Sequence, residues 1–179
     1  MHEKHENNAI VTDFIRWIHE NGGSYPKISW PVDDPSCGSR GAIAQADIAS
    51  DEPMLFIPIK LMMSPPNAYK DPVIGAILEE NEDNLQDDLL LAVFIMYEVS
   101  KGKSSFWYPY IRMLPEPETA MRWTDAELRE LQDIRVMTRI RSRMRSLKSV
   151  FDRRVKAFFS CYPDIFDDAT FHFASFKFQ

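Results

Sequence analysis

The stretch Ser105-Phe106-Trp107-Tyr108-Pro109-Tyr110-Ile111, followed by Leu114-Pro115, places four aromatic side chains within five positions. Large aromatic side chains bury much apolar area when they pack. We therefore predict that this block has a structural role and fixes the loop that follows a helix. The segments on both sides of the block have helical patterns, and short strands are expected only nearer the N-terminus.

The segment before the aromatic block predicts a helix over residues 84–101. Leu89–Tyr97 is apolar without interruption, so this helix should be buried on most of its sides. Asn84 is suited to the N-cap position, and the aspartates that follow it suit the first turn, where the helix dipole favours negative charge. Gly102 follows the expected end of the helix, as a C-terminal cap residue does.

The segment after the block predicts a second helical region that begins at Thr124. Thr124 and Glu127 have the spacing of a capping box, in which each side chain bonds the backbone N–H of the other residue. Apolar residues then recur every three or four positions from Leu128 to Phe158. This spacing predicts one apolar stripe along a helix, with a break near Arg135.

A strongly basic face opposes this stripe. Residues 135–156 contain nine Lys or Arg and one acid, Asp152, for a net charge of +8; the whole chain carries −6, so the other residues carry −14. Aromatic side chains that would stack on bases are not interleaved with the cations, which favours a solvated helix face over a nucleic-acid surface. If this face is functional, the chain is a non-catalytic protein-interaction module that uses the basic helix 135–156 to bind an acidic protein, which is an alternative to a catalytic function. Alternatively, the basic helix face complements the acidic run 79–88, either within this chain or on a partner chain.

The N-terminal third predicts one helix and three short strands. Apolar residues from Ile10 to Ile18 share one helix face, and Gly22-Gly23 ends the helix. The polar turn 49–52 is expected to join the last two strands into an antiparallel hairpin. The strands are expected at residues 28–30, 41–48 and 54–57. The fold class is therefore α+β, with short antiparallel strands and a predominantly helical region after about residue 60.

The composition is that of a soluble globular protein. The 179 residues are 45% hydrophobic and 27% charged, which is sufficient for one core. The N-terminus lacks the apolar region of a secretory signal, and the longest apolar stretch is about half of a membrane span. We therefore expect an intracellular protein, in the cytoplasm, the nucleus or an organelle, that is neither secreted nor in a membrane.

Common catalytic and metal-binding motifs do not occur in the sequence. There is no glycine-rich nucleotide-binding motif and no Gly-x-Ser-x-Gly elbow. The two cysteines and four histidines do not have metal-ligand spacing. One local feature remains: Gly38-Ser39-Arg40-Gly41 precedes an expected strand. It is either a simple turn or a loop whose backbone cradles a ligand.

The order of several motifs resembles the first part of a SET domain. On these motifs the chain is similar to the SET-domain protein methyltransferases, in the branch that contains the Rubisco large-subunit lysine methyltransferase and the actin-histidine methyltransferase. The resemblance runs from about Phe14 to Glu130 and continues more weakly to Phe173. The matching residues are Phe14-Ile15-Arg16-Trp17 with Asn21-Gly22-Gly23, Gly38-Ser39-Arg40-Gly41-Ala42-Ile43-Ala44, Asp47-Ile48, Glu52, Leu55, Ile57-Pro58, Leu61-Met62-Met63-Ser64, the block Ser105–Ile111 with Leu114-Pro115, and Trp123 with Glu127-Leu128 and Leu131.

This resemblance implies S-adenosylmethionine as the cofactor and a lysine or histidine of a protein as the substrate. Gly38, Ser39 and Arg40 match cofactor-contacting positions of the family, which often has an acidic residue where this chain has Gly38. The family's Asn-His motif and its downstream catalytic tyrosine segment have no counterpart in this sequence, so no catalytic residue is assigned. We therefore expect the chain to be inactive alone: it is either a truncated gene product or a chain that needs a partner chain to complete the fold.

The resemblance also divides the chain into three parts. These are an N-terminal helix (residues 1–24), a partial SET domain that includes the buried helix 84–101 (residues 25–115), and a helical insert that continues to a truncated end (residues 116–179).

Overall fold

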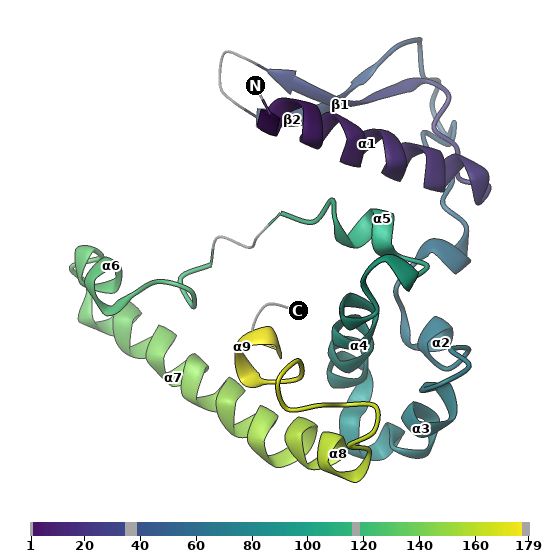
Figure 1. Cartoon of the computed structure of the whole chain (residues 1–179). Helices are drawn as coiled ribbons and strands as arrows, with labels where there is room; N and C mark the ends of the chain where they lie inside the picture. The colour runs from purple at the N-terminus through teal and green to yellow at the C-terminus, as the bar shows by residue number, and fades with distance from the viewer. Residues whose placement is uncertain (1, 35–38, 116–118, 177–179) are drawn as a thin grey trace. The chain divides into compact units, whose positions relative to one another are not determined.

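The computed structural model describes residues 2–34, 39–115 and 119–176 and divides the chain into two compact units. The first unit combines Met1–Met62 with Phe106–Met113, and the second combines Met63–Ser105 with Leu114–Gln179. Figure 1 shows the elements of both. Each unit is therefore discontinuous in sequence, and each is described by itself below.

In its described residues, the first unit contains one long helix, one two-stranded sheet and two short helical turns. The helix α1 ends at a glycine pair, as the sequence predicts. Gly22 has a φ of 89°, a conformation that favours glycine, and the N–H of Gly23 donates to the carbonyl oxygen of Ile18 at 2.9 Å. The elements are α1 (His2–Glu20), β1 (Ile28–Asp34), β2 (Ser39–Ala44), the 3₁₀ turn η1 (Ile59–Leu61) and α5 (Tyr108–Ile111).

The sheet pairs β1 with β2, so the predicted strand pairing was wrong. Residues 54–57 form no strand; Phe56 makes only an isolated bridge, in which its backbone N–H and C=O both bond Ser24, at 2.8 and 2.9 Å. The ammonium group of Lys27 donates to the carbonyl oxygen of Asp47 and pairs with Glu52. These contacts bring the segment after β2 back toward the start of β1, which leaves the 54–57 segment opposite Ser24 instead of β2.

The aromatic block has the structural role that the sequence predicts. Trp107 is buried, and its indole N–H donates to the carbonyl oxygen of Leu61 at 3.2 Å. Measured between ring centroids, Phe106 lies 5.4 Å from Trp17 of α1, and Tyr110 of α5 lies 6.1 Å from Phe14. The block therefore fixes the end of its loop against α1 and η1.

In the described residues of the second unit, 63–105, 114–115 and 119–176, all regular secondary structure is helical. Its central helix α4 is buried as predicted, because no residue from Leu89 to Glu98 is exposed. The helices are α2 (Pro65–Ala68), α3 (Gly75–Glu80), α4 (Glu82–Ser100), α6 (Asp125–Glu130), α7 (Ile134–Val150), α8 (Lys156–Cys161) and α9 (Phe173–Phe176), with a 3₁₀ turn η2 (Gly102–Ser104) and a π-helical turn η3 (Phe151–Val155).

The predicted N-cap of α4 was wrong. The helix begins at Glu82, two residues earlier, so Asn84 lies inside its first turn. Asn81 precedes the helix instead, and its side chain donates to the carbonyl oxygen of Ile77 in α3. Gln86 then interrupts the helix with a φ of 53°, so α4 consists of a short turn and a longer helix that meet at a kink.

The helical region after the block confirms both predicted features. The hydroxyl of Thr124 accepts from the backbone N–H of Glu127, whose carboxylate accepts from the N–H of Thr124 at 2.7 Å. The break falls just before Arg135: Gln132 has a φ of 50°, and the carboxylate of Asp133 accepts from the N–H of Arg135 at 2.8 Å and so caps α7.

The phenylalanine-rich C-terminal segment packs on the turn between α7 and α8. Phe171 and Phe176 are buried. Phe171 lies 5.3 Å from Phe159, and Phe176 lies 5.2 Å from Phe151, measured between ring centroids. The segment therefore covers the side of η3 and α8 that carries Phe151 and Phe159.

Candidate functional site

Two of the three predicted cofactor-contacting residues, Ser39 and Arg40, lie at the start of β2 in the first unit. Gly38 is outside the described residues. Ser39 opens β2 and is paired in register with Asp34 of β1, and Arg40 is paired with Asp33. The segment is therefore the return strand of a hairpin, and its position in the first unit is fixed by the β1–β2 pairing.

The side chain of Arg40 forms an ion pair across this hairpin. Its Nε donates to a carboxylate oxygen of Asp33 at 2.8 Å, with side-chain exposures of 40% and 72%. Exposed ion pairs contribute little to stability, so the pair mainly orients the guanidinium group. A guanidinium group has five N–H donors, and in the described part of the chain the other four make no hydrogen bond. They are available to an anionic group outside these residues.

The backbone beside Arg40 is open. A Cβ added at Gly41 would meet no atom within 4 Å, and every residue from Arg40 to Ala44 is exposed. Ile43 is 52% exposed although it is a large apolar residue. A ligand or a further polypeptide can therefore approach the described part of β2 closely. No group of three or more His, Cys, Asp or Glu within the described ranges is placed to hold a metal ion.

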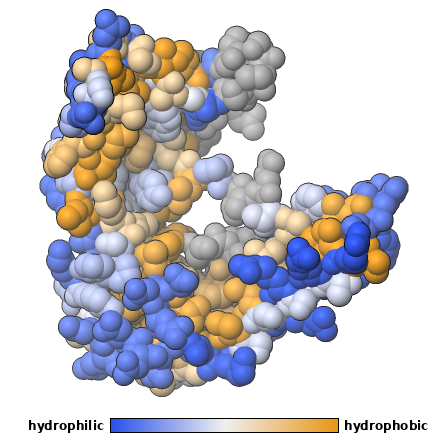
Figure 2. Space-filling view, turned by 180° about the vertical axis from the view of Figure 1, so that it is seen from behind, coloured by the Kyte–Doolittle hydropathy of each residue, from blue (hydrophilic) through white to orange (hydrophobic). Residues whose placement is uncertain are grey.

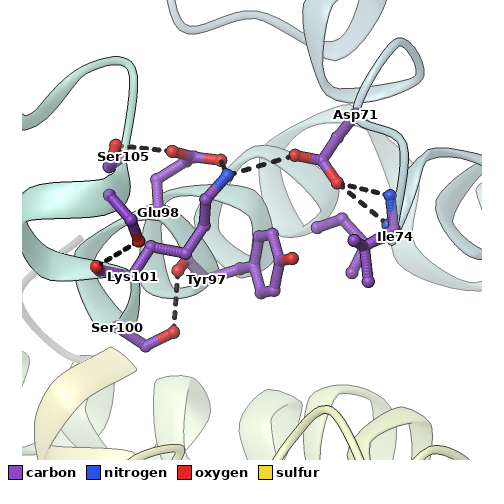
Figure 3. Close-up of polar contacts among 9 residues, drawn as sticks. Asp71, Ile74, Tyr97, Glu98, Ser100, Lys101 and Ser105 are labelled. Atoms are coloured by element: carbon purple, nitrogen blue, oxygen red, sulfur yellow. Dashed lines mark hydrogen bonds and ion pairs between the residues drawn. The ribbon is translucent and has the colours of Figure 1, made fainter.

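The sequence did not predict a buried polar network in the second unit (Figure 3). Glu98 of α4 is fully buried; its carboxylate accepts from the hydroxyl of Ser105 at 2.5 Å and from the ammonium group of Lys101 at 2.7 Å. Lys101 also pairs with Asp71 at 3.3 Å, and Asp71 accepts from the N–H of Ile74 at 3.0 Å. The network joins the end of α4 to the loop between α2 and α3.

The two carboxylates near Lys101 favour its charged form. Burial lowers the pKa of Lys101, but its hydrogen bond to Glu98 and the charges of Glu98 and Asp71 outweigh burial and raise the pKa above its ordinary value. The ammonium group also lies 5.1 Å from the ring centre of Tyr97. The lysine is therefore charged and serves as the counter-ion of two carboxylates, which is a structural role. The i, i+3 spacing of Glu98 and Lys101 was the signal in the sequence that could have revealed the pair.

With this geometry established, the chain can be compared with known proteins. No protein-family profile matches it. Over 122 residues it is 32% identical to the actin-histidine N-methyltransferase of Canis lupus familiaris, an alignment that covers 67% of this chain and 20% of that protein. Over 120 residues it is 31% identical to Protein SET DOMAIN GROUP 40 of Arabidopsis thaliana, with 60% and 24% covered.

Solved structures show the fold. The SET domain of LSMT bound to lysine and AdoHcy matches with a TM-score of 0.78 at 21% identity, over 96% of this chain and 37% of that chain. The chain has part of the SET fold. Rubisco LSMT bound to sinefungin and monomethyllysine gives a TM-score of 0.74 at 22% identity, over 94% and 38%.

The predicted resemblance to the SET-domain methyltransferases is thus confirmed in sequence and in fold, and so is the α+β class. The chain spans about a fifth to a quarter of the length of the two curated relatives. None of the helices in the described residues is long and apolar enough to cross a membrane.

Proposed function

We propose that this chain supplies the N-terminal part and the helical insert of an S-adenosylmethionine-dependent SET-type protein methyltransferase, with a lysine or histidine side chain as the methyl acceptor. The single observation that carries the proposal is the match of 96% of the chain to a SET domain bound to lysine and AdoHcy. The relatives named as actin-histidine N-methyltransferases support a protein substrate.

The residues of the hairpin fit one end of the cofactor. S-adenosylmethionine has a carboxylate on its methionine part, and a guanidinium group with unused N–H donors is suited to bind a carboxylate in a forked geometry. Arg40, oriented by Asp33, would bind that carboxylate, and the open backbone at Gly41 allows close approach. Gly38 and Ser39 would complete this wall. When bound, the cofactor supplies a methyl group on a positively charged sulfur.

Further polypeptide, in this chain or in a partner chain, completes the site in our proposal. The first unit exposes large apolar side chains that a finished core would cover, and Figure 2 shows hydrophobic residues on its surface in the upper part of the view. These are Ile43, Met54, Leu55, Phe56 and Ile59, each more than half exposed. Methyl transfer needs the acceptor held in line with the methyl group and water excluded. The 179 residues alone are therefore expected to be inactive.

Photo-crosslinking of radiolabelled S-adenosylmethionine to the purified chain tests the proposed cofactor wall, because crosslinking registers weak binding. Arg40→Ala should reduce the labelling about tenfold, since a hydrogen bond to a charged group contributes about 1.5–3 kcal/mol. Arg16→Ala is the matched control: Arg16 is also exposed and paired with an aspartate, at 3.2 Å. Equal labelling of the two variants would exclude Arg40 from the cofactor wall.

A methylation assay tests the need for further polypeptide. The purified chain, mixed with labelled S-adenosylmethionine and a protein extract in which endogenous methyltransferases are heat-inactivated, should transfer no label to protein. Transfer by the chain alone would refute the proposed incompleteness and would leave the family assignment intact.

A further inference from the structure

The outer surface of α7 carries two rows of cations separated by small polar residues. Arg135, Arg139 and Arg143 are four residues apart and so lie on one side of the helix. Arg141, Arg145 and Lys148 form the second row, at spacings of four and three. Thr138 and Ser142 lie between the rows at 100° per residue, and both are exposed. Figure 2 shows hydrophilic residues along this helix, which extends to the right in that view.

Some of these cations already have partners in the chain. Arg141 pairs with Asp125 at 2.7 Å, and Lys148 pairs with Asp152 at 2.7 Å. Within the residues that the structure describes, Arg139, Arg143 and Arg145 form no ion pair and no hydrogen bond through their side chains, and all three are exposed. These three unpaired guanidinium groups, which we call the free arginine cluster, come from both rows.

The dimensions of the rows match an acidic helix. Cations four residues apart repeat about every 6 Å along α7, and the two rows together extend over about 20 Å. An acidic helix with glutamates at every fourth position repeats at the same interval. The side chains of Thr138 and Ser142 are small, so they leave room between the rows for the backbone of such a helix. Guanidinium groups suit carboxylates because they bind both oxygens at once.

Nucleic acid fits this surface less well. Helix α7 contains no aromatic residue on which a base could stack. The chain outside residues 135–156 carries −14, which repels a phosphate backbone that extends beyond the basic segment. At the far end of the surface, Arg154 lines an open groove of about 840 Å³ together with Glu82, Asp83, Asp87 and Asp88. A short acidic segment can avoid these carboxylates by ending before the groove.

From charge, spacing and exposure we infer that the free arginine cluster on α7 is a docking surface for an acidic helical segment of a partner protein. The inference does not depend on methyl transfer, because α7 contains none of the residues assigned to the cofactor. A docked partner would be held by several weak, solvent-exposed ion pairs, so the binding should be fast and strongly salt-dependent.

Fluorescence anisotropy with the full chain and a labelled helical peptide, with glutamate at every fourth position in an alanine background, tests this inference. The triple variant Arg139→Glu/Arg143→Glu/Arg145→Glu should weaken binding more than tenfold, because each ion pair changes from attractive to repulsive. The triple variant with glutamine at the same positions should weaken it about tenfold, and it remains informative if the glutamate variant does not fold. Lys60→Glu/Lys70→Glu/Lys103→Glu, with the same change in net charge away from α7, should bind like the unmodified chain.

Three outcomes would overturn the inference. The first is equal loss of binding in the lysine control, which would show a general charge effect. The second is tighter binding of a DNA duplex or of anionic lipid vesicles than of the acidic peptide under the same salt conditions. The third is an absence of peptide binding by the unmodified chain at low salt.

Discussion

Replacement of Lys101 by methionine removes the counter-ion of two carboxylates in the second unit. Loss of one partner of a buried ion pair costs about 3–5 kcal/mol when the remaining charge is fully buried. Here Lys101 is 27% exposed, so water recovers part of the lost interaction. The carboxylate of Glu98 keeps the hydroxyl of Ser105, and that of Asp71 keeps two backbone N–H groups. We therefore expect Lys101→Met to destabilise the protein by about 2–3 kcal/mol.

Urea denaturation followed by far-UV circular dichroism measures this change, because the second unit contains most of the helix. Lys103→Met is the matched control: Lys103 lies two residues away, is exposed, and should change stability by less than about 0.5 kcal/mol. A double-mutant cycle with Glu98→Gln should give a coupling energy of about 1–2 kcal/mol. A loss in Lys101→Met no larger than in the control, or strict additivity in the cycle, would refute the role of Lys101 as counter-ion.

Three further predictions concern other parts of the structure. Gly75→Ala places a Cβ 2.3 Å from a backbone carbonyl oxygen, so it should lower the free energy of unfolding by more than about 2 kcal/mol. Gly102→Ala has open space around the new Cβ but a φ of 53°, so it should lower the free energy of unfolding by about 1 kcal/mol. Thermal denaturation compares the two variants. Thr124→Ala removes the capping box of α6 and should cost about 1 kcal/mol in the same assay. Burial raises the pKa of Tyr97, and the contacts with Glu98 and Asp71 raise the pKa of Lys101, so the folded state holds both protons more tightly than the unfolded state. The stability of the protein should therefore fall as the pH rises above about 10. A series of denaturation curves in which stability rose in that range would contradict this prediction.

Local patterns predicted the helical part of the chain because its signals are local. The capping box at Thr124 and the break before Arg135 depend on residues within a few positions of one another. The uninterrupted apolar run of α4 required burial whatever covered it. The strand pairing failed because two competing segments, 28–34 and 54–57, were both suited to pair with β2. The choice between them depends on Ser24 and Lys27, whose contacts with Phe56, Asp47 and Glu52 are distant in sequence.

The sequence identified only part of the candidate site, and it missed the buried network of the second unit, for a related reason. A motif identified Ser39 and Arg40, but the residue that orients Arg40 is Asp33, on the other strand of the hairpin. Glu98 was not identified because it directly follows an apolar run. Hydrophobic periodicity predicts a buried apolar side chain at such a position and gives no signal for a buried carboxylate. The structure shows that this position is indeed in the core and that Lys101 makes the buried carboxylate tolerable.

The discontinuity of the first unit links the aromatic block to the proposed cofactor wall. Helix α1 and the β1–β2 hairpin precede the second unit in sequence, yet they pack with Phe106–Met113, which follows its first segment. Phe14 shows this directly, because its ring contacts Trp30 of β1 at 5.7 Å and Tyr110 of α5 at 6.1 Å. The hairpin that presents Arg40 is therefore supported by residues 70 positions away. The strong motif at 105–111 thus acts on the candidate site through packing, and it need not touch a ligand to be required for binding one.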